Sequence, residues 1–298
     1  MAMYSAKTLP VDRVLNARID AGNLPDIFSS TVPTKRDFED SIRLFDERMP
    51  DYRGMLTAEY FGGEIDTLYD PIEDGDWRWL VRTRLYRNTS TKVTVRDNEW
   101  VEIRDGFTDA LHGDVARLAD RLFDRDISLG QWLRQMAKLI KQAHCGAWLL
   151  GCGGWNGLTS LAVSDIDRQL RNLYSFLHSY AQEVREGSLE ERQLRRAITY
   201  RGLVNKGVMF IESMTVSAER GRTMGYGFHP DTLPNYPGDG TTECLTNCRC
   251  HWRFRFFTPE PGYYHAFWTL LRNRPDGRNC LTCLRYAVTY NPYSVARF

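Results

Sequence analysis

Five of the seven cysteines of this 298-residue chain lie in its last fifth, and this clustering constrains the fold more than any other feature of the sequence. They form two short groups: Cys244, Cys248 and Cys250, then Cys280 and Cys283. Glycines and prolines are frequent between residues 225 and 240, so long regular elements are not expected there. Residues 226–298 are therefore predicted to form a loop-rich module that depends on metal or disulfide cross-links rather than on a large core.

The spacing of these cysteines favours a structural zinc site. A tetrahedral Zn²⁺ ion takes four ligands, commonly two from each of two short turns. We expect the ligands to be Cys244, Cys248, Cys280 and Cys283, with Cys250 as an additional structural cysteine. The first group departs from the regular C-x-x-C pattern, so two alternatives stay open: disulfides that join Cys250 to the second group, and buried thiols without a metal. In a reducing cytoplasm, clustered cysteines favour metal binding over disulfides.

The chain as a whole is predicted to be of the α+β class, with short helices and an antiparallel β-meander in residues 1–106. Thr34 is a candidate N-cap for a helix in which Phe38, Ile42 and Phe45 recur at helical spacing. From residue 77 onward, short β-type sequences alternate with turn residues. The strands of the meander are expected at residues 79–81, 85–86, 93–95 and 100–103.

Residues 107–225 are predicted to form a bundle of long helices. The first helix starts at about Thr108, and Ser128 is the N-cap of a second, which ends in the glycine-rich stretch 151–157. The periodicity of apolar residues predicts a third helix over 164–186 and an unusually long fourth helix over 189–222. Helices joined by such short connections are typical of a bundle.

Within the terminal module, residues 226–298, strands are expected at 251–257 and 284–290 and a helix at 263–271. In the first strand arginines alternate with aromatic residues, so one face is cationic and the other aromatic. The candidate contacts for phosphate groups or for a partner are Arg249, Arg253 and Arg255. We favour the simpler interpretation, in which the strand is half-buried and its arginines face solvent.

The segment Asn247-Cys248-Arg249-Cys250, preceded by Leu233-Pro234 and Pro237-Gly238-Asp239-Gly240, resembles the minor head proteins of tailed bacteriophages, the Mu F-like head-morphogenesis family. In that family a helical region precedes the cysteine module, as is predicted here. The resemblance covers about residues 108–250, and its specific part is 233–250. One departure is the order of the turns. The family places its C-x-x-C turn before the Asn-Cys-Arg-Cys segment, whereas Cys280 and Cys283 follow that segment here.

The resemblance implies a virion structural protein, a minor head or head–tail component near the portal vertex, that acts through protein–protein contacts and not as an enzyme. Its partners would be portal, major capsid or neck proteins, with packaged DNA as a further partner. It would assemble as a homo-oligomer within the particle, after synthesis in the host cytoplasm. The alternative function is a zinc-stabilised nucleic-acid-binding module.

Two properties of the whole chain restrict these functions. The formal net charge of +1 provides no overall field that would attract the chain to nucleic acid. No apolar run approaches the roughly 20 residues that a membrane-spanning helix needs, so no membrane association is expected.

Overall fold

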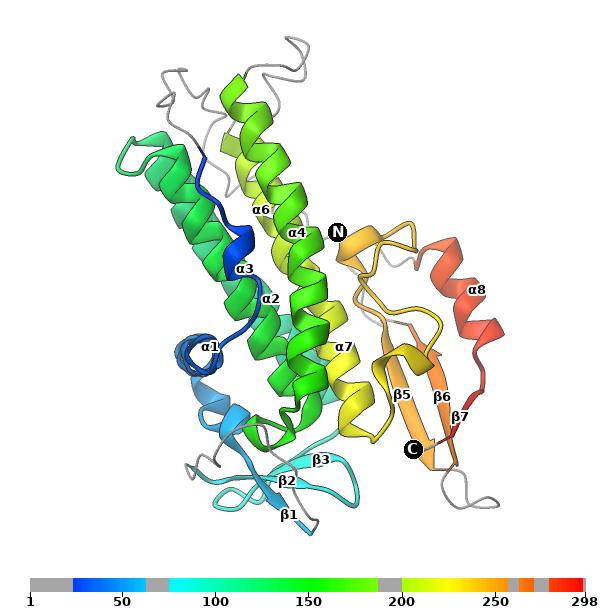
Figure 1. Cartoon of the computed structure of the whole chain (residues 1–298). Coiled ribbons are helices and arrows are strands. Elements are labelled where there is room, and N and C mark those ends of the chain that lie inside the picture. Colours follow the sequence, from blue (N-terminus) through cyan, green and yellow to red (C-terminus); the bar gives the residue numbers. More distant parts are fainter. Residues whose placement is uncertain (1–23, 63–74, 187–199, 257–262, 271–278, 297–298) are drawn as a thin grey trace.

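The structure, a computed structural model, describes residues 24–62, 75–186, 200–256, 263–270 and 279–296 (Figure 1). A small sheet lies at one end of a layer of long helices, and a cysteine-containing module packs against the side of that layer. The predicted α+β class is therefore confirmed. In the described ranges, no helix is both long enough and apolar enough to cross a membrane.

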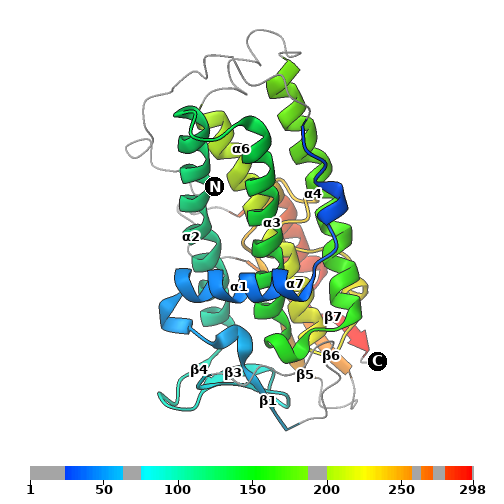
Figure 2. The same cartoon turned by 60° about the vertical axis from the view of Figure 1, so that its left-hand side comes forward.

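The N-terminal helix α1 (Lys35–Arg48) begins where the sequence predicts it. Thr34 and Asp37 form a capping box, in which each side chain accepts a hydrogen bond from the backbone N–H of the other residue. Phe38 and Phe45 are completely buried. Figure 2 shows α1 lying across the long helices α2 (Asp97–Phe123) and α3 (Leu129–Cys152). Short 3₁₀ turns lie nearby at Phe28–Ser30, Pro50–Tyr52 and Met55–Thr57.

The N-terminal sheet has the strand order β1-β2-β3-β4. Its strands are β1 (Glu59–Phe61), β2 (Trp77–Leu80), β3 (Leu85–Asn88) and β4 (Thr94–Val95). The last three are antiparallel neighbours as predicted, but β1 runs parallel to β2, so the sheet is mixed. Parallel pairing needs a long connection, and residues 62–76 provide one, whereas the short link between β2 and β3 permits only a hairpin.

The strand predicted at residues 100–103 is wrong, because these residues belong to α2. This helix begins at Asp97, well before the expected start at Thr108. The Glu99 carboxylate accepts a hydrogen bond of 2.6 Å from the N–H of Arg96, and so caps the helix. Trp100, Ile103, Phe107 and Leu111 are buried at helical spacing. The domain boundary predicted after residue 106 consequently falls inside α2.

The next two helices follow the prediction. Ser128 and Gln131 form the capping box of α3, and α4 (Ser160–Glu186) covers the expected third helix. Helix α3 packs against α1, α2, α4 and α7 (Met214–Gly225), which places it at the centre of the helical layer.

The single long helix predicted over 189–222 is wrong in its described part. It is divided at Ser213 into α6 (Tyr200–Glu212) and α7, while residues 189–199 lie outside the described residues. The Ser213 hydroxyl donates a hydrogen bond of 2.6 Å to the carbonyl of Phe210 and lies 3.1 Å from Nε2 of the buried His144. Such local bonds compete with the helical hydrogen-bond pattern, which accounts for the break.

Glycines allow the backbones of α3 and α7 to touch. A Cβ atom at Gly151 of α3 would lie 2.2 Å from the Ala218 carbonyl oxygen, and one at Gly221 of α7 would lie 2.5 Å from the Trp148 carbonyl oxygen. Both distances are well inside van der Waals contact with backbone atoms. The glycines in this part of the chain therefore serve helix packing.

The N-terminal sheet and the start of α2 together cap the carboxyl end of α3. Tyr60 donates a hydrogen bond of 2.7 Å to the Cys152 carbonyl. Tyr86 and Trp100 donate to the Leu150 carbonyl at 3.0 and 3.1 Å. The last carbonyls of a helix have no partner within it, so these three side chains satisfy groups that would otherwise be buried without hydrogen bonds.

The described part of the terminal module contains an antiparallel sheet of order β5-β6-β7 and the α-helix α8. These are β5 (His251–Phe256), β6 (Tyr263–Thr269), α8 (Leu281–Thr289) and β7 (Tyr293–Ala296). The strand at 251–256 is confirmed. The helix predicted at 263–271 and the strand predicted at 284–290 are both wrong, because the former segment is β6 and the latter lies largely in α8.

Pairing and capping explain this reversal. The aromatic segment of β6 pairs along its whole length with β5, where Trp268 lies opposite Trp252. Helix α8 is started by Cys280, whose sulfur accepts a hydrogen bond from the N–H of Cys283. Tyr286 and Tyr290 then pack around Trp252 and Trp268 in the module's own apolar cluster.

We predict that Gly221→Ala lowers the free energy of unfolding by about 1–3 kcal/mol, because the added methyl group overlaps the backbone of α3. The measurement is urea unfolding followed by circular dichroism. Gly113→Ala on α2 is the matched control, since its nearest neighbour is the flexible Arg117 side chain at 3.6 Å. That change should leave stability unaltered or raise it by up to about 1 kcal/mol. Equal stability of the two variants would contradict the close helix contact.

Candidate metal centre

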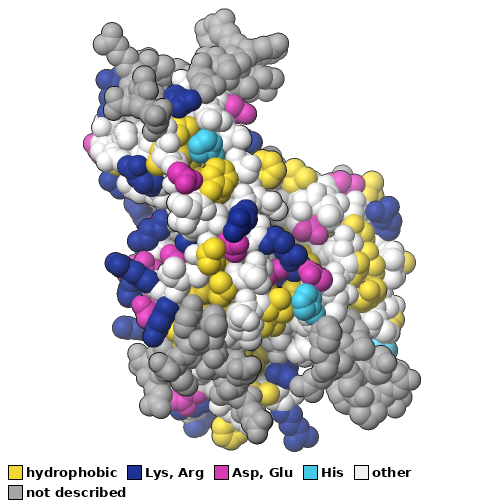
Figure 3. Space-filling view, viewed as in Figure 1, with side chains coloured by type: hydrophobic (Ala, Val, Ile, Leu, Met, Phe, Trp, Pro, Cys, Tyr) yellow, Lys and Arg dark blue, Asp and Glu magenta, His cyan; other side chains and the backbone are white. Residues whose placement is uncertain are grey.

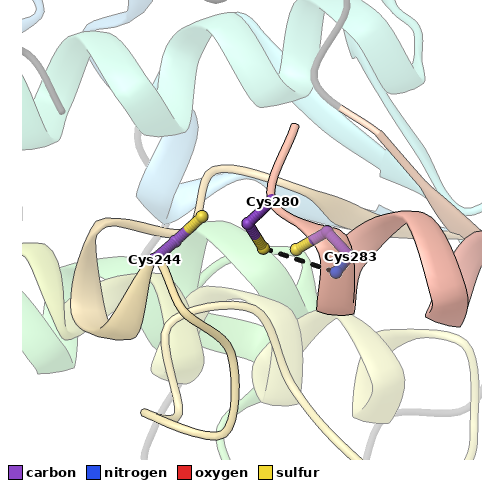
Figure 4. Close-up of side chains that lie close together, drawn as sticks. All are labelled: Cys244, Cys280 and Cys283. Carbon is purple, nitrogen blue, oxygen red and sulfur yellow. Dashed lines mark hydrogen bonds between the residues drawn. The ribbon is translucent and has the colours of Figure 1, made fainter. Parts of the chain in front are cut away.

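The two cysteine groups, which are about thirty residues apart in sequence, converge between the start of β5 and the start of α8. Cys244 and Cys248 flank the short 3₁₀ turn Leu245–Asn247, and Cys250 directly precedes β5. Cys280 is the N-cap of α8, and Cys283 lies in its first turn. Figure 4 shows Cys244 on one segment and Cys280 and Cys283 on the other, with their sulfur atoms near one another.

The sulfur atoms form two groups of three that share Cys283. Within each group all sulfurs lie within 4.8 Å of one another. One group is Cys244, Cys280 and Cys283, and the other is Cys248, Cys250 and Cys283. The Cys248 and Cys283 sulfurs are 3.5 Å apart. Four sulfurs bound to one tetrahedral zinc ion at about 2.3 Å would be separated by about 3.8 Å, so the spacing suits a zinc–thiolate centre.

The donor set fits a soft metal ion. Cys248, Cys250 and Cys283 are almost fully buried, whereas Cys244 and Cys280 are partly exposed. None of the seven cysteines forms a disulfide. Thiolates are the ligands that zinc and other soft metals prefer, and a buried thiolate needs a nearby positive charge. The cysteine cluster could therefore hold a metal ion such as zinc.

Neighbouring thiols shift one another's protonation. The pKa of Cys248 is lowered, chiefly by a hydrogen bond from Cys244. The pKa of Cys283 is raised, chiefly because Cys248 and Cys250 accept hydrogen bonds from it, and burial adds to this effect. Without a cation, Cys248 is thus the thiol that ionises more readily, and Cys283 is the one that stays protonated. A divalent ion would neutralise several thiolates together.

Glu243, which no sequence motif marks as a site residue, connects the two cysteine groups. Its carboxylate accepts a hydrogen bond of 2.8 Å from the N–H of Leu281 and lies 3.5 Å from the Thr282 hydroxyl. It therefore binds the amino end of α8, where negative charge is favourable. The only signal in the sequence is its position next to Cys244.

The structure places all the predicted site cysteines in one cluster. The proposed ligands Cys244, Cys248, Cys280 and Cys283 are there, and Cys250, assigned a structural role, is part of the same cluster. Their grouping into two overlapping sets of three was not foreseen. The choice of four ligands among the five cysteines stays a prediction.

The three candidate arginines have different surroundings. Arg249 turns toward the helices, where its guanidinium donates to Glu212 at 2.8 Å and to Asp109 at 2.7 Å. The guanidinium carbons of Arg253 and Arg255 lie 5.5 and 5.6 Å from the centre of the Phe267 ring on the neighbouring strand β6. Arg249 is thus engaged within the chain, and the cationic face of β5 comprises Arg253 and Arg255.

A second group of possible metal ligands, Asp109, His112 and Glu212, lies on α2 and α6. The Glu212 carboxylate is 3.1 Å from Nε2 of His112. The Arg249 guanidinium bonds to both carboxylates of this group and so supplies the positive charge that a metal ion would bring. We therefore assign this group to the ion pairing of Arg249.

A buried ion cluster, which no local sequence pattern indicates, attaches β5 to the helices. Arg104 of α2 is completely buried, and it donates to Glu219 of α7 at 2.6 Å. Glu219 in turn accepts a hydrogen bond of 3.1 Å from the N–H of Trp252. Arg222 donates to the Trp252 carbonyl at 2.9 Å and also pairs with Asp97. These side chains occupy the edge of β5 that has no strand partner among the described residues.

Burial and the neighbouring positive charges have opposite effects on the pKa of Glu219. Burial raises the pKa of its carboxyl group, while the positive charges of Arg104 and Arg222 work against that rise. The net pKa is above the ordinary value. Removal of either arginine would therefore leave a buried carboxyl group with insufficient compensation.

Comparison with known proteins adds no further information on the site. No family model, no curated protein sequence and no solved structure matches the chain. The roles given to these residues consequently rest on their chemistry and geometry.

We predict that the purified chain contains about one zinc ion and that Cys283→Ser removes it, because Cys283 belongs to both sulfur groups. The measurement is metal content by mass spectrometry after gel filtration. Cys145→Ser is the control, since Cys145 is equally buried but lies in α3, outside the cluster. Zinc-free wild-type protein, or equal zinc content in Cys283→Ser, would contradict the metal centre.

Proposed function

We propose that this chain is a structural protein of a tailed-bacteriophage virion, a minor head or head–tail component at the portal vertex. It acts through contacts with neighbouring copies and with portal, major capsid or neck proteins, and it carries out no catalysis. In this proposal a Zn²⁺ ion held by Cys244, Cys248, Cys280 and Cys283 stabilises the terminal module, with Cys250 beside it.

The similarity to the phage family is supported by the structural role of its motif residues. In the turn Pro237-Gly238-Asp239-Gly240, the Asp239 carboxylate accepts hydrogen bonds from the N–H groups of Tyr236 and Thr241 at 2.7 and 2.8 Å. Gly238 and Gly240 have φ angles of +84°, which glycine adopts readily. Gly238, Asp239 and Gly240 therefore each have a conformational role in the turn.

The observation that carries the proposal is an apolar stripe on the outer face of α8. Leu281 and Val288 are 76% and 80% exposed, and Leu284 between them is 43% exposed. Figure 3 shows hydrophobic side chains gathered over this part of the module. The opposite face of α8 already packs on the sheet through Cys283, Tyr286 and Ala287. A surface helix with two apolar faces is expected to pack against something else, and a neighbouring chain would cover the outer face.

The tyrosines near the C-terminus are already packed within the module. Tyr286, Tyr290 and Tyr293 cluster with Trp252 and Trp268. The exposed aliphatic residues of α8 are Leu281, Leu284 and Val288, and Arg285 and Thr289 are exposed beside them. We therefore assign docking to Leu281, Leu284 and Val288.

We predict that the double variant Leu284→Ser/Val288→Ser reduces incorporation into particles at least about tenfold, since burial of two aliphatic side chains contributes about 1.5–3 kcal/mol each. The measurement is the amount of chain in gradient-purified particles, determined by immunoblot. Phe61→Ser is the matched control, because Phe61 is 67% exposed on the N-terminal sheet, far from α8 in sequence.

Two outcomes test the α8 surface and the virion function separately, and a folding control accompanies them. Normal incorporation of the double variant would reject the α8 surface. Absence of the wild-type chain from particles would reject the virion function. Zinc content and circular dichroism of the double variant should match the wild type, because neither side chain is in the module's core.

A second candidate function, a zinc-stabilised module that binds nucleic acid, is favoured by one observation. Two guanidinium groups, those of Arg253 and Arg255, lie over the Phe267 ring, and Arg255 is exposed. Arginine and aromatic side chains together can contact phosphates and stack on bases. Arg249 is excluded from this surface because it is paired with Glu212 and Asp109.

If the module binds nucleic acid, DNA binding should be weak and should depend on salt. A plot of the logarithm of the association constant against the logarithm of salt concentration should have a slope of about −2, one unit for each arginine. Fluorescence anisotropy with a labelled oligonucleotide measures it. The variant Arg253→Ala/Arg255→Ala should lose the salt-dependent part, whereas Arg117→Ala on α2 should not. Binding that is absent, or unaffected by the double substitution, would reject this function.

A further inference from the structure

The segment Cys248-Arg249-Cys250 contacts the sulfur cluster on one side and the helices on the other. The backbone at Cys248 is extended, and β5 begins at His251, so successive side chains point in opposite directions. Cys248 and Cys250 point into the sulfur cluster. Arg249, between them, points to the helices. The same three residues therefore contact the metal centre on one side and the helical layer on the other.

On the helical side, Arg249 enters an acidic site formed by α2 and α6. Its Nε and Nη2 atoms donate to the two carboxylate oxygens of Glu212 at 3.2 and 2.8 Å, and Nη2 also donates to Asp109 at 2.7 Å. Glu212 is only 2% exposed, and His112 holds its carboxylate on the other side. Burial alone would raise the pKa of Glu212, but the hydrogen bond from His112 and the charge of Arg249 lower it overall. This is a formed ion-pair site, not a chance surface contact.

The backbone of the turn makes further bonds to the same helices. The carbonyls of Arg249 and Cys250 accept hydrogen bonds from Arg104 at 2.9 and 3.2 Å. These bonds require the two consecutive carbonyls to face α2, and this orientation depends on the backbone conformation that Cys248 and Cys250 adopt. Displacement of either cysteine would therefore disturb both the carbonyl contacts and the Arg249 ion pair.

We propose that metal binding and docking of the terminal module on the helices are energetically coupled through residues 248–250. The metal ion binds Cys248 and so holds residues 248–250 in place, with Cys250 packed beside the centre. This arrangement directs Arg249 into the acidic site of Asp109 and Glu212. The inference rests on the metal centre proposed above and assigns it a second role, the control of an interface inside the chain. Coupling is reciprocal, so residues of the acidic site must influence metal affinity although they are not ligands.

The test compares the zinc affinity of full-length variants by competition with a chromophoric chelator. We expect Arg249→Ala and Asp109→Asn each to weaken zinc binding by about tenfold, within the 5–150-fold range typical of coupled sites. Asp109 is suited to this test because its side chain is 56% exposed, so its replacement by an isosteric amide leaves the packing intact. Arg255→Ala in the same module is the control, and its zinc affinity should equal that of the wild type.

The opposite direction of the coupling is measured by hydrogen exchange. Removal of zinc with a chelator should increase exchange at the Trp252 amide, which is bonded to Glu219, and over residues 104–112 of α2. Exchange in α3 should not change. This readout reports docking directly and does not depend on any substitution.

Each result decides one of the proposals. Zinc affinities of Arg249→Ala and Asp109→Asn within twofold of the wild type, or unchanged exchange after zinc removal, would overturn the coupling and leave the metal centre standing. No zinc binding by the wild-type chain would overturn the metal centre itself.

Discussion

Arg104 and Glu219 form a completely buried ion pair, and the attachment of the terminal module to the rest of the molecule depends on it. An edge strand such as β5 carries backbone groups with no strand partner. Here they are bound by side chains of α2 and α7, through Arg104, Glu219 and Arg222. The cost of burying these charges is offset only if all of them are paired and hydrogen-bonded. The module must consequently present its backbone in one well-defined conformation.

The cysteine cluster is the feature that could hold the module's backbone in this one conformation. Residues 226–250 contain short 3₁₀ turns and loops, which have little conformational rigidity of their own. Cys248 and Cys250 belong to the module's apolar cluster around Trp252 and Trp268, and the carbonyl of Arg249 between them bonds to Arg104 of the helices. A metal ion bound to thiolates from both segments would hold this turn and the start of α8 together. The outer aliphatic face of α8 would then be presented on a rigid support, as a docking role requires.

Local signals in the sequence predicted much of this architecture, and non-local ones were missed. The N-caps at Thr34 and Ser128 and the strand at β5 depend on signals within a few residues and were predicted correctly, whereas Arg249 does not face solvent as expected. Short apolar segments were ambiguous: residues 100–103 and 284–290 read as strands, yet both follow a helix-starting cap. The parallel pairing of β1 and the partners of Arg104, up to 146 residues away, depend on tertiary structure alone.

The same distinction holds for the site. The types and spacing of the cysteines were enough to predict that the two groups meet, because thiols clustered in this way have few other roles. The sequence did not reveal that Arg249, within the same motif, would serve the helical interface rather than a phosphate, since Glu212 and Asp109 lie in distant helices. The most direct measurement of the central claim is X-ray absorption at the zinc edge on the purified full-length chain. The account predicts a single shell of four sulfur atoms at about 2.3 Å. A shell of oxygen or nitrogen atoms, or no zinc at all, would contradict it.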